Sequence, residues 1–300
     1  MEVGELEDEF ADFVPGSILI TDGDGPAYVC AATVKTVPTA VRRYQQKMLE
    51  QMFLAKCETA EVHLTHETCT KAGRYAIKGV KPYQGQRGGS AKPALLAPVR
   101  AAVAQPQNWL PEYEVFMQYI VEADDSMMMS AYRLKEHGII RSDDKDLRQT
   151  PYDYYDIKSG KIIKADPVGH LYIDYTGAGT LKLLGHSLKF FWAQMLMGDT
   201  ADNVQGILKL DGKTCGPKGA YDKLHPITDI NEIANTVIDA YRAINQNPLP
   251  EGWFHSVKDV RFEHSFVNKL TRCVSAVRRP YRNGPAIREI RALYSIALGE

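Results

Sequence analysis

Short apolar runs alternate with helical patterns along the first half of the chain. The runs SILIT, AEVHLT, YEVFMQYIV and GIIR are rich in branched or aromatic residues and predict strands. Helical patterns lie between them, from about Pro38 to Lys56 and through DSMMMSAYRLKEH. Strands that alternate with helices predict an α/β fold with a mostly parallel twisted sheet, whose functional groups gather at the carboxyl ends of the strands.

The second half of the chain shows a different pattern. YDIKSGKII predicts a hairpin whose turn contains Ser159 and Gly160. From about His186 onward the pattern is helical, through GHSLKFFWAQMLMGD and then from Ile230 to Asn245. The chain is therefore expected to divide into an acidic extension at 1–16, an α/β core at 17–185 and a helical region at 186–300.

The segment between Tyr83 and Trp109 is rich in Gly, Ala, Pro and Gln and carries several basic residues. Within it, ALLAPVRAAVA predicts a short helix. One interpretation is a mobile basic loop, or arch, near 84–110 that covers a functional site. The alternative is a plain surface connection, which is the usual nature of such a segment.

Acidic residues gather in four short clusters, each close behind an apolar run. TDGD follows SILI, VEADD follows YIV, SDDKD follows GII, and MGDTADN follows FFWAQMLM. The carboxylates are therefore expected at the ends of elements and near one another in space. Converging carboxylates repel one another unless cations neutralise them, and oxygen ligands suit hard divalent ions. The acids in question are Asp22, Asp24, Glu122, Asp124, Asp125, Asp144, Asp146, Asp199 and Asp202.

Spacing within the clusters predicts which acids share a side. In SDDKD, an extended backbone places Asp144 and Asp146 on one side, with Lys145 turned away. Asp199 and Asp202 are three residues apart and share a face if the local turn is helical. A site built from many carboxylates suits phosphoryl transfer, in which two metals activate water and stabilise the leaving oxygen. No P-loop and no Ser/His/Asp nucleophile set competes with this interpretation.

The composition indicates a folded protein with an uneven distribution of charge. In 300 residues, 44% hydrophobic and 24% charged, there is enough apolar material for a substantial buried core. The net charge of −1 conceals a basic stretch near the C-terminal end. An acidic centre with a basic flank suits phosphodiester binding, and the alternative for the basic stretch is a solvated helix face. Its members are Lys269, Arg272, Arg278, Arg279, Arg282, Arg288 and Arg291.

Cysteine usage favours a reducing compartment. The five cysteines form no CxxC pair, which argues against a disulfide framework and against a standard zinc site. A zinc site made by His63 and His66 with Cys57 and Cys69 matches no standard spacing, so structural roles are the expected ones. MEVGELEDEF has neither the basic nor the apolar region of a signal peptide, and no apolar stretch suits a membrane span. We therefore expect a cytoplasmic protein.

The ordered set VEADD, SDDKD and MGDTADN, preceded by an early strand ending in Asp-Gly and by a YxxxR element, resembles the structure-specific 5′-nuclease family. This family includes flap endonucleases, 5′-nuclease domains of bacterial polymerases and phage 5′-to-3′ exonucleases. The phage enzymes are the most similar, because the early motif reads DGD and because DYYDIKSGKII follows SDDKD. The matching segments run from about Ile18 to Tyr221. The resemblance implies a PIN-like α/β sheet flanked by helices and a helical C-terminal region that binds duplex DNA.

The resemblance also implies roles for individual residues. Two or more Mg²⁺ ions, with Mn²⁺ as a substitute, would be held by Asp22, Glu122, Asp124, Asp125, Asp144, Asp146, Asp199 and Asp202. VQGILKLDGKTCGPKGAYDKL loosely matches the family's helix-hairpin-helix-like element, which binds the duplex backbone and often a monovalent cation such as K⁺. That segment matches through Gly206, Gly216, Lys218 and Gly219, and the expected DNA contacts are Tyr83, Gln84, Arg87, Lys92, Arg100, Gly216, Lys218 and Gly219, with Arg87 also in a catalytic role.

The chain departs from the family at two positions. The family usually has Lys directly after the Tyr of YxxxR, whereas Gln84 follows Tyr83 here. A neutral amide cannot replace that charge, so either a nearby base substitutes or the rate falls by about 10²-fold. The bases considered are Lys81, Lys78 and Arg74. The second departure is His66, followed by Glu67, where the family has Asp; imidazole could ligate a metal, and a simple surface His is the alternative.

These observations lead to a principal hypothesis and two alternatives. The principal hypothesis is a metal-dependent 5′-to-3′ exonuclease or flap endonuclease that hydrolyses DNA and leaves 5′-phosphates, with a role in phage DNA replication. The Tyr83 ring would stack on a terminal base. The first alternative is a catalytically weakened relative that acts as a DNA-binding accessory protein, and the second is a PIN-type ribonuclease.

Overall fold

The computed structural model describes residues 13–71, 75, 84–85, 91–164, 166–201, 204–207 and 209–246. The strands are β1 Val14–Asp22, β2 Cys57–Thr65, β3 Tyr113–Gln118, β4 Gly138–Arg141, β5 Tyr154–Asp156, β6 Lys161–Ile163, β7 Leu171–Tyr175, β8 Leu181–Gly185, β9 Gly198–Asp199, β10 Val204–Gln205, β11 Lys209–Leu210 and β12 Lys213–Thr214. The α-helices are α2 Asp24–Thr33, α3 Val37–Leu54, α4 Leu96–Val103, α5 Ala123–Leu134, α6 Ser187–Met197, α7 Pro217–Leu224 and α8 Ile230–Gln246. Short 3₁₀ turns are η2 Pro106–Asn108, η3 Lys135–His137 and η4 Lys145–Gln149.

A six-stranded sheet in the order β3-β2-β1-β4-β5-β6 forms the centre of the α/β part. Neighbouring strands from β3 to β5 are parallel, and only β6 is antiparallel, as the hairpin partner of β5. The chain leaves β1 toward β2 on one side and later returns to β4 on the other side. The carboxyl end of β1 therefore lies at the point where the strand order reverses, which is where open α/β sheets place their ligands. The predicted α/β fold with a mostly parallel sheet is confirmed.

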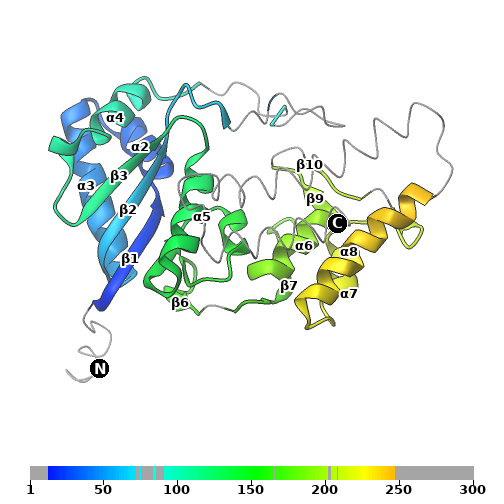
Figure 1. The fold of residues 1–300 in the computed structure, drawn as a ribbon. Helices are drawn as coiled ribbons and strands as arrows, with labels where there is room; N and C mark the ends of the chain where they lie inside the picture. The colour runs from blue at the N-terminus through cyan, green and yellow to red at the C-terminus, as the bar shows by residue number, and fades with distance from the viewer. Residues whose placement is uncertain are drawn as a thin grey trace.

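Alternate residues of the strands enter two different cores. Leu19 and Ile139 pack with α2, α3 and α4 on one face of the sheet. Their neighbours Ile20 and Ile140 pack with α5 and α6 on the other face. This alternation follows from the two-residue period of a strand and makes a three-layer arrangement, with the sheet between α3 and α5 (Figure 1).

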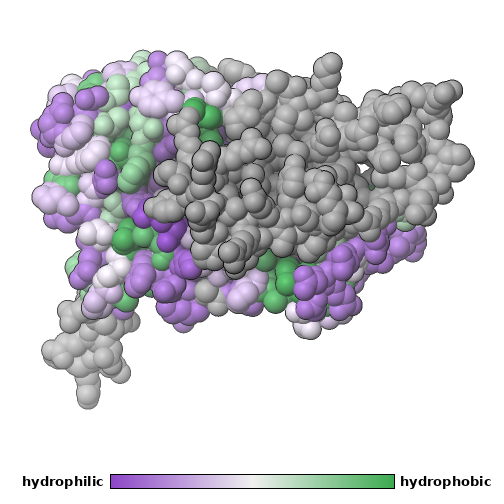
Figure 2. Space-filling model, viewed as in Figure 1, coloured by the Kyte–Doolittle hydropathy of each residue, from purple (hydrophilic) through white to green (hydrophobic). Residues whose placement is uncertain are grey.

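Helix α6 anchors the helical part of the molecule. Its residues are buried almost all round, and Trp192 is completely buried in the core cluster that α6 shares with α7 and α8. Such all-round burial is expected of a helix that other elements enclose. Gly198, at φ 75°, ends α6 in the left-handed region and leads directly into Asp199. On the face seen in Figure 2, the described surface carries small apolar patches among hydrophilic residues.

Most predicted elements are confirmed by the structure. SILIT lies in β1, AEVHLT in β2 and GIIR in β4, while the helix expected from Pro38 to Lys56 is α3. The hairpin with Ser159 and Gly160 in its turn is β5–β6. The antiparallel ribbon β7–β8 has no counterpart in the sequence prediction. The prediction of helical structure from His186 onward is also incomplete, because four strands of two residues each lie between α6 and α7 in the described part.

The turn between β1 and α2 needs a glycine. The Gly23 N–H donates to the His63 carbonyl at 2.8 Å, which joins the end of β1 to β2. A Cβ at this position would lie 2.5 Å from the Tyr44 hydroxyl of α3 and 2.9 Å from Val62 Cγ1. Because Tyr44 is completely buried, it cannot move away. Steric exclusion therefore requires glycine between Asp22 and Asp24.

Candidate functional site

Acids from three parallel strands meet at the carboxyl edge of the sheet. Asp22 ends β1, Glu122 lies behind β3, and Asp144 follows β4. Asp24 opens α2, directly after β1. Burial, together with the neighbouring carboxylates of Asp24 and Asp144, raises the pKa of Asp22 to about 7. Burial likewise raises the pKa of Asp24, with a contribution from Glu122 behind β3. The mutual repulsion of these groups shows that negative charge converges on this edge.

The acids after β3 begin helix α5. Glu122 is its N-cap, and a capping box links the Glu122 side chain with the Asp125 backbone and the Asp125 carboxylate with the Glu122 N–H at 3.0 Å. Asp125 is completely buried, whereas Asp124 occupies the first helical turn, where the helix dipole favours a carboxylate. The capping box thus holds Glu122 in place at the helix start.

Basic side chains pair with these acids. Lys71 Nζ lies 2.9 Å from Glu122 Oε1, and Arg100 Nη2 from α4 lies 2.9 Å from Asp24 Oδ1. The Lys71 ammonium also donates to Gln84 Oε1 at 2.9 Å and lies 5.5 Å from the centre of the Tyr75 ring. Burial alone would lower the pKa of Lys71, but Glu122 reverses this and raises it. A positive charge therefore lies directly beside Gln84.

Lys71 is a residue that sequence reasoning missed. The substitutes considered for the absent lysine, Lys81, Lys78 and Arg74, lie outside the described residues, as do Tyr83 and Arg87. The sequence contains one usable signal, a lysine that follows β2 by only a few residues and so starts near the carboxyl edge of the sheet.

A second acidic group lies between η4 and the end of α6. The side chains of Asp146 and Asp199 are 4% and 2% exposed, and Lys145 Nζ bridges them at 2.9 Å and 3.1 Å. Asp146 also accepts from Gln194 Nε2 at 2.6 Å, and Asp199 accepts from the Ala201 N–H at 2.9 Å. Asp202, the expected companion of Asp199, lies outside the described residues.

The prediction that Lys145 turns away from the acids is wrong. It assumed an extended SDDKD segment, whereas Asp144 caps the 3₁₀ turn η4 and accepts from the Asp146 N–H at 2.8 Å. In a turn of this kind the side chains no longer alternate between two sides. Burial would lower the pKa of Lys145, but Asp146 and Asp199 raise it above its ordinary value. The ammonium is therefore a cation held between two buried carboxylates.

The donor chemistry suits divalent ions, although the side chains do not form a closed cage. Among the described residues, no three His, Cys, Asp or Glu side chains surround a common point within reach of an ion. The carboxylates are nevertheless hard oxygen donors, and a cation would offset both the burial and the neighbouring acids that raise the pKa of Asp22. An ion at the second group would compete with Lys145 for Asp146 and Asp199.

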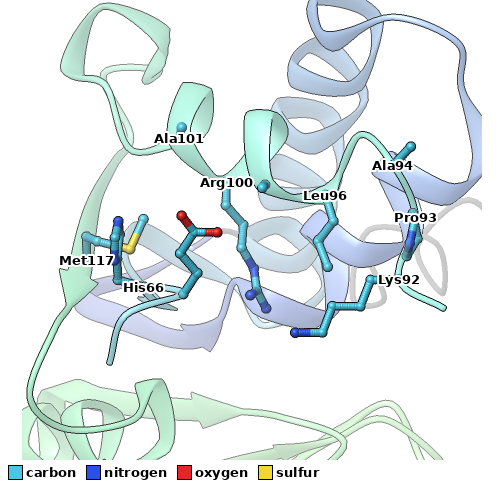
Figure 3. Close-up of a pocket in the computed structure, with 10 residues that line it drawn as sticks. His66, Lys92, Pro93, Ala94, Leu96, Arg100, Ala101 and Met117 are labelled. Atoms are coloured by element: carbon cyan, nitrogen blue, oxygen red, sulfur yellow. The ribbon is translucent and has the colours of Figure 1, made fainter. Parts of the chain in front are cut away.

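His66 follows β2 and contacts Thr68 and Tyr119. Its Nδ1 lies 2.8 Å from Thr68 Oγ1, and its ring lies 4.5 Å from the Tyr119 ring. With Lys92, Arg100 and Met117 it lines a pocket of about 170 Å³ beside α4 (Figure 3). The predicted DNA contacts Lys92 and Arg100 therefore lie together, close to Asp24.

The predicted helix-hairpin-helix-like segment has two parts. KLDGKT forms the β11–β12 hairpin with Gly212 in its turn, which accounts for most of the stretch inserted relative to the family. Gly216 is the N-cap of α7, in which Gly219 also lies. The Lys218 side chain is largely exposed and pairs with Asp222.

The known proteins that this chain resembles share its fold. No family model and no curated protein sequence matches this chain. Among solved structures, the T5 D15 protein crystallised with metal ions has a TM-score of 0.52 at 16% identity, and T5 5′-exonuclease with bound zinc has 0.51 at 15%. The bacteriophage T5 flap endonuclease in a pseudo-enzyme–product complex with DNA and metal ions has 0.51 at 15%. Each match covers 94% of this chain and 99% of the other.

This chain has the T5 5′-exonuclease fold. At identities of 15% and 16% the likeness is one of fold, and it confirms the structural resemblance to phage 5′ nucleases that the motifs predicted. Within the T5 5′-exonuclease fold, the described helices include none that is both long and apolar enough to cross a membrane.

Two residues of the zinc alternative, His63 and Cys57, have structural contacts in this T5 5′-exonuclease fold. His63 is 1% exposed, its Nδ1 lies 2.8 Å from Ser126 Oγ, and its ring stacks on Phe116 at 5.4 Å. The Cys57 thiol donates to the Ala55 carbonyl at 3.4 Å. These contacts give both residues structural roles on the sheet.

We expect the burial of His63 to make the protein sensitive to acid. Burial, and then the nearby Arg133, lower the pKa of His63 from 6.5 to about 3. Because the unfolded chain takes up the proton first, the stabilising effect of neutral His63 is complete above pH 6.5 and declines below it, by about 2 kcal/mol at pH 5. Chemical denaturation at pH 7 and pH 5 should show a smaller decline for His63→Gln than for the wild type.

The exposed His137 provides the control for that measurement. His137→Gln should follow the wild type at both pH values. Equal declines for wild type and His63→Gln would contradict the assignment of the acid sensitivity to His63.

Proposed function

We propose that this protein is a metal-dependent 5′ nuclease that hydrolyses DNA phosphodiesters at or near 5′ ends and leaves 5′-phosphates, as an exonuclease or flap endonuclease. One observation carries the proposal: acids from the ends of β1, β3 and β4 converge at the switch point of the sheet. The fold is shared with a bacteriophage T5 flap endonuclease that was solved with DNA and metal ions, which supports the same substrate class.

The carboxylates divide into two groups that suit two ions, Mg²⁺ or Mn²⁺. We assign Asp22, Glu122, Asp124, Asp125 and Asp144 to the first and Asp146, Asp199 and Asp202 to the second, with Asp24 as a helper of the first. Divalent ions held there would supply Lewis-acid stabilisation of the attacked phosphate and of the leaving oxygen.

The other residues of the site hold the acidic side chains in place or supply positive charge. Arg100 keeps the Asp24 carboxylate directed toward α4, and the capping box holds Glu122 at the start of α5. Lys71 supplies an ammonium between Gln84 and Glu122, where it can donate to a phosphate oxygen of the scissile strand. Lys71 thereby takes the part that the lysine absent at position 84 would have.

Lys71→Met should lower the maximal cleavage rate by about 10²-fold, the usual effect of removing one contact to the transition state. DNA affinity should change much less. A lysine restored at the neighbouring position, Gln84→Lys in the Lys71→Met background, should recover most of the rate. Single-turnover kinetics on a flap substrate measures these rates, and the exposed Lys35→Met serves as control. A rate that is unchanged in Lys71→Met would contradict this role.

The decisive experiment for the proposed function uses 5′-labelled DNA. Purified protein is incubated with nicked, blunt and flap substrates in Mg²⁺, Mn²⁺ or EDTA, and the products are resolved on denaturing gels. Cleavage from the 5′ end that depends on the metal, with 5′-phosphate products, is the expected result.

The alternative, a DNA-binding accessory protein, is favoured by the two lysines that already neutralise acids. Unimpaired DNA binding without cleavage in either metal would overturn the nuclease proposal and leave this alternative. Cleavage confined to an RNA strand would instead favour a ribonuclease.

A further inference from the structure

Strand β2 lies between β1 and β3 in the sheet, and both of these neighbours lead into acids of the first group. Asp22 ends β1, and Glu122 lies behind β3. Two strand spacings separate β1 from β3, a distance of about 10 Å. Carboxylates that start so far apart share an ion most readily when the segments that carry them bend over the end of β2. The end of β2 therefore decides how closely these acids approach one another.

Thr65, the last residue of β2, contacts both of the acid-bearing segments. Its backbone N–H donates to the Asp24 carboxylate, with each oxygen at 3.2 Å. Its side-chain Oγ1 accepts from the Ala123 N–H at 2.9 Å. Asp24 opens α2 directly after β1, and Ala123 opens α5 directly after Glu122. One residue thus joins the starts of two helices that come from opposite sides of β2.

The hydroxyl of Thr65 satisfies a backbone group that helix α5 cannot satisfy itself. The first N–H groups of a helix have no acceptor within the helix. The capping box uses the Glu122 side chain for the N–H of Asp125, so the N–H of Ala123 needs another acceptor. Ala123 is 2% exposed, which leaves little access for water. Thr65 therefore acts as a cap of α5 that a neighbouring strand provides.

His63, two residues before Thr65, makes the same two kinds of contact. Its Nδ1 lies 2.8 Å from Ser126 Oγ of α5, and its carbonyl accepts from the Gly23 N–H at 2.8 Å. Residues two apart share a face of a strand, and Ala123 and Ser126, three apart, share a face of a helix. The side chains on this face of β2 thus hold the first turn of α5, while the backbone of β2 holds the turn after β1.

We propose that Thr65 is a positioning residue, whose hydroxyl fixes the start of α5 against the end of β2 and so sets the distance between the acids after β1 and those after β3. The inference rests on the proposed function, in which those acids hold the first ion. Thr65 acts through α5 and is not itself a ligand. Hydrogen-bond partners behind metal ligands typically contribute about 10–100-fold to metal affinity.

The test separates ion binding from folding. Thr65→Val keeps the shape of the side chain and the N–H that holds Asp24 but removes the acceptor for Ala123, whereas Thr65→Ser keeps that acceptor. Calorimetric titration of the full chain with Mn²⁺ should show binding about tenfold weaker in Thr65→Val and nearly unchanged in Thr65→Ser. Thermal unfolding in EDTA should shift downward by only about 2–4 °C, because one buried hydrogen bond is lost.

Matched variants identify the acids through which Thr65 acts. Thr59→Val makes the same change at an exposed position of β2 and should bind Mn²⁺ as the wild type does. In a Glu122→Gln background, Thr65→Val should cost less than about threefold, because the carboxylate that it positions is already gone. In an Asp199→Asn background, which alters the second group, the loss should stay about tenfold. Hydrogen exchange of the Ala123 amide in EDTA should be faster in Thr65→Val.

A lower melting temperature without weaker Mn²⁺ binding would overturn the proposal, as would an equal loss in Thr65→Ser or no Mn²⁺ binding by the wild type. Thr65→Ala removes the same acceptor and provides the second variant if Thr65→Val does not fold. Mn²⁺ binding that depends on Thr65 in a protein that cleaves no DNA would reject the proposed nuclease and leave the role of Thr65 in place. Cleavage with Mn²⁺ affinity independent of Thr65 would do the reverse.

Discussion

The double variant Asp22→Asn, Asp144→Asn should lose DNA cleavage by about 10³-fold or more and yet melt at a higher temperature than the wild type in EDTA. The loss follows because each amide removes a charged oxygen ligand, and ion-supplied stabilisation of the transition state is worth several kcal/mol. The gain in stability follows because burial and neighbouring acids oppose the charge on Asp22 in the folded protein. The amide keeps the hydrogen bond that Asp22 Oδ1 accepts from the Asp24 N–H at 2.8 Å.

Activity and stability are therefore expected to change in opposite directions. Single-turnover cleavage in Mg²⁺ measures the first, and thermal unfolding in EDTA measures the second. Asp143→Asn is the matched control, because Asp143 is the exposed neighbour of Asp144. It should change neither quantity appreciably. A double variant that retains cleavage, or one that melts lower than the wild type, would show that these acids do not form a site of converging charge.

Lys145→Met should lower the unfolding free energy of the metal-free protein by about 2–4 kcal/mol. Removing one partner of a buried ion pair leaves its charge uncompensated, which usually costs about 3–5 kcal/mol, and the partial exposure of Lys145 reduces that figure. Asp146 and Asp199 would both be left without their shared ammonium. Addition of Mn²⁺ should restore more stability to Lys145→Met than to the wild type, because no ammonium competes for the acids.

Urea denaturation with and without Mn²⁺ measures this effect. The control is Lys158→Met, which removes an ammonium 3.9 Å from the Asp174 carboxylate in a pair whose two side chains are 80% and 46% exposed. Exposed pairs contribute about 0–1 kcal/mol, so this variant should remain close to the wild type. Equal behaviour of the two variants would show that Lys145 does not act as an internal cation for the second group.

The hydrophobic pattern was sufficient for the parts of the fold that depend on local sequence. β1, β2 and β4 appear as short branched runs, and α3 and α5 have the helical period, so their order already indicates a parallel sheet. The ribbon β7–β8 was missed because its strands are only five residues long and LYIDY carries the exposed aromatic residues Tyr172 and Tyr175, so apolar and polar positions do not alternate clearly. The acid clusters were found because each follows an element end.

The charges that balance those acids could not be found in the same way. Lys145 contacts Asp199, which is 54 positions away in the chain, and Lys71 contacts Glu122 across the sheet edge. Such pairs depend on tertiary packing and leave no local period. The extended geometry assumed for SDDKD failed for a related reason, since the hydrogen bond from the Asp146 N–H to Asp144 closes a 3₁₀ turn.

The close approach of the Tyr44 hydroxyl to Gly23 links the acidic edge of the sheet to helix α3. Tyr44 belongs to the buried face of α3, and its hydroxyl fills the place where a side chain at position 23 would stand. Tyr44 thereby restricts the position between Asp22 and Asp24 to glycine. Substitutions under α3, such as Met48→Ala, should weaken ion binding by the proposed nuclease before the protein unfolds, so that a change in the core can alter a site that it does not touch.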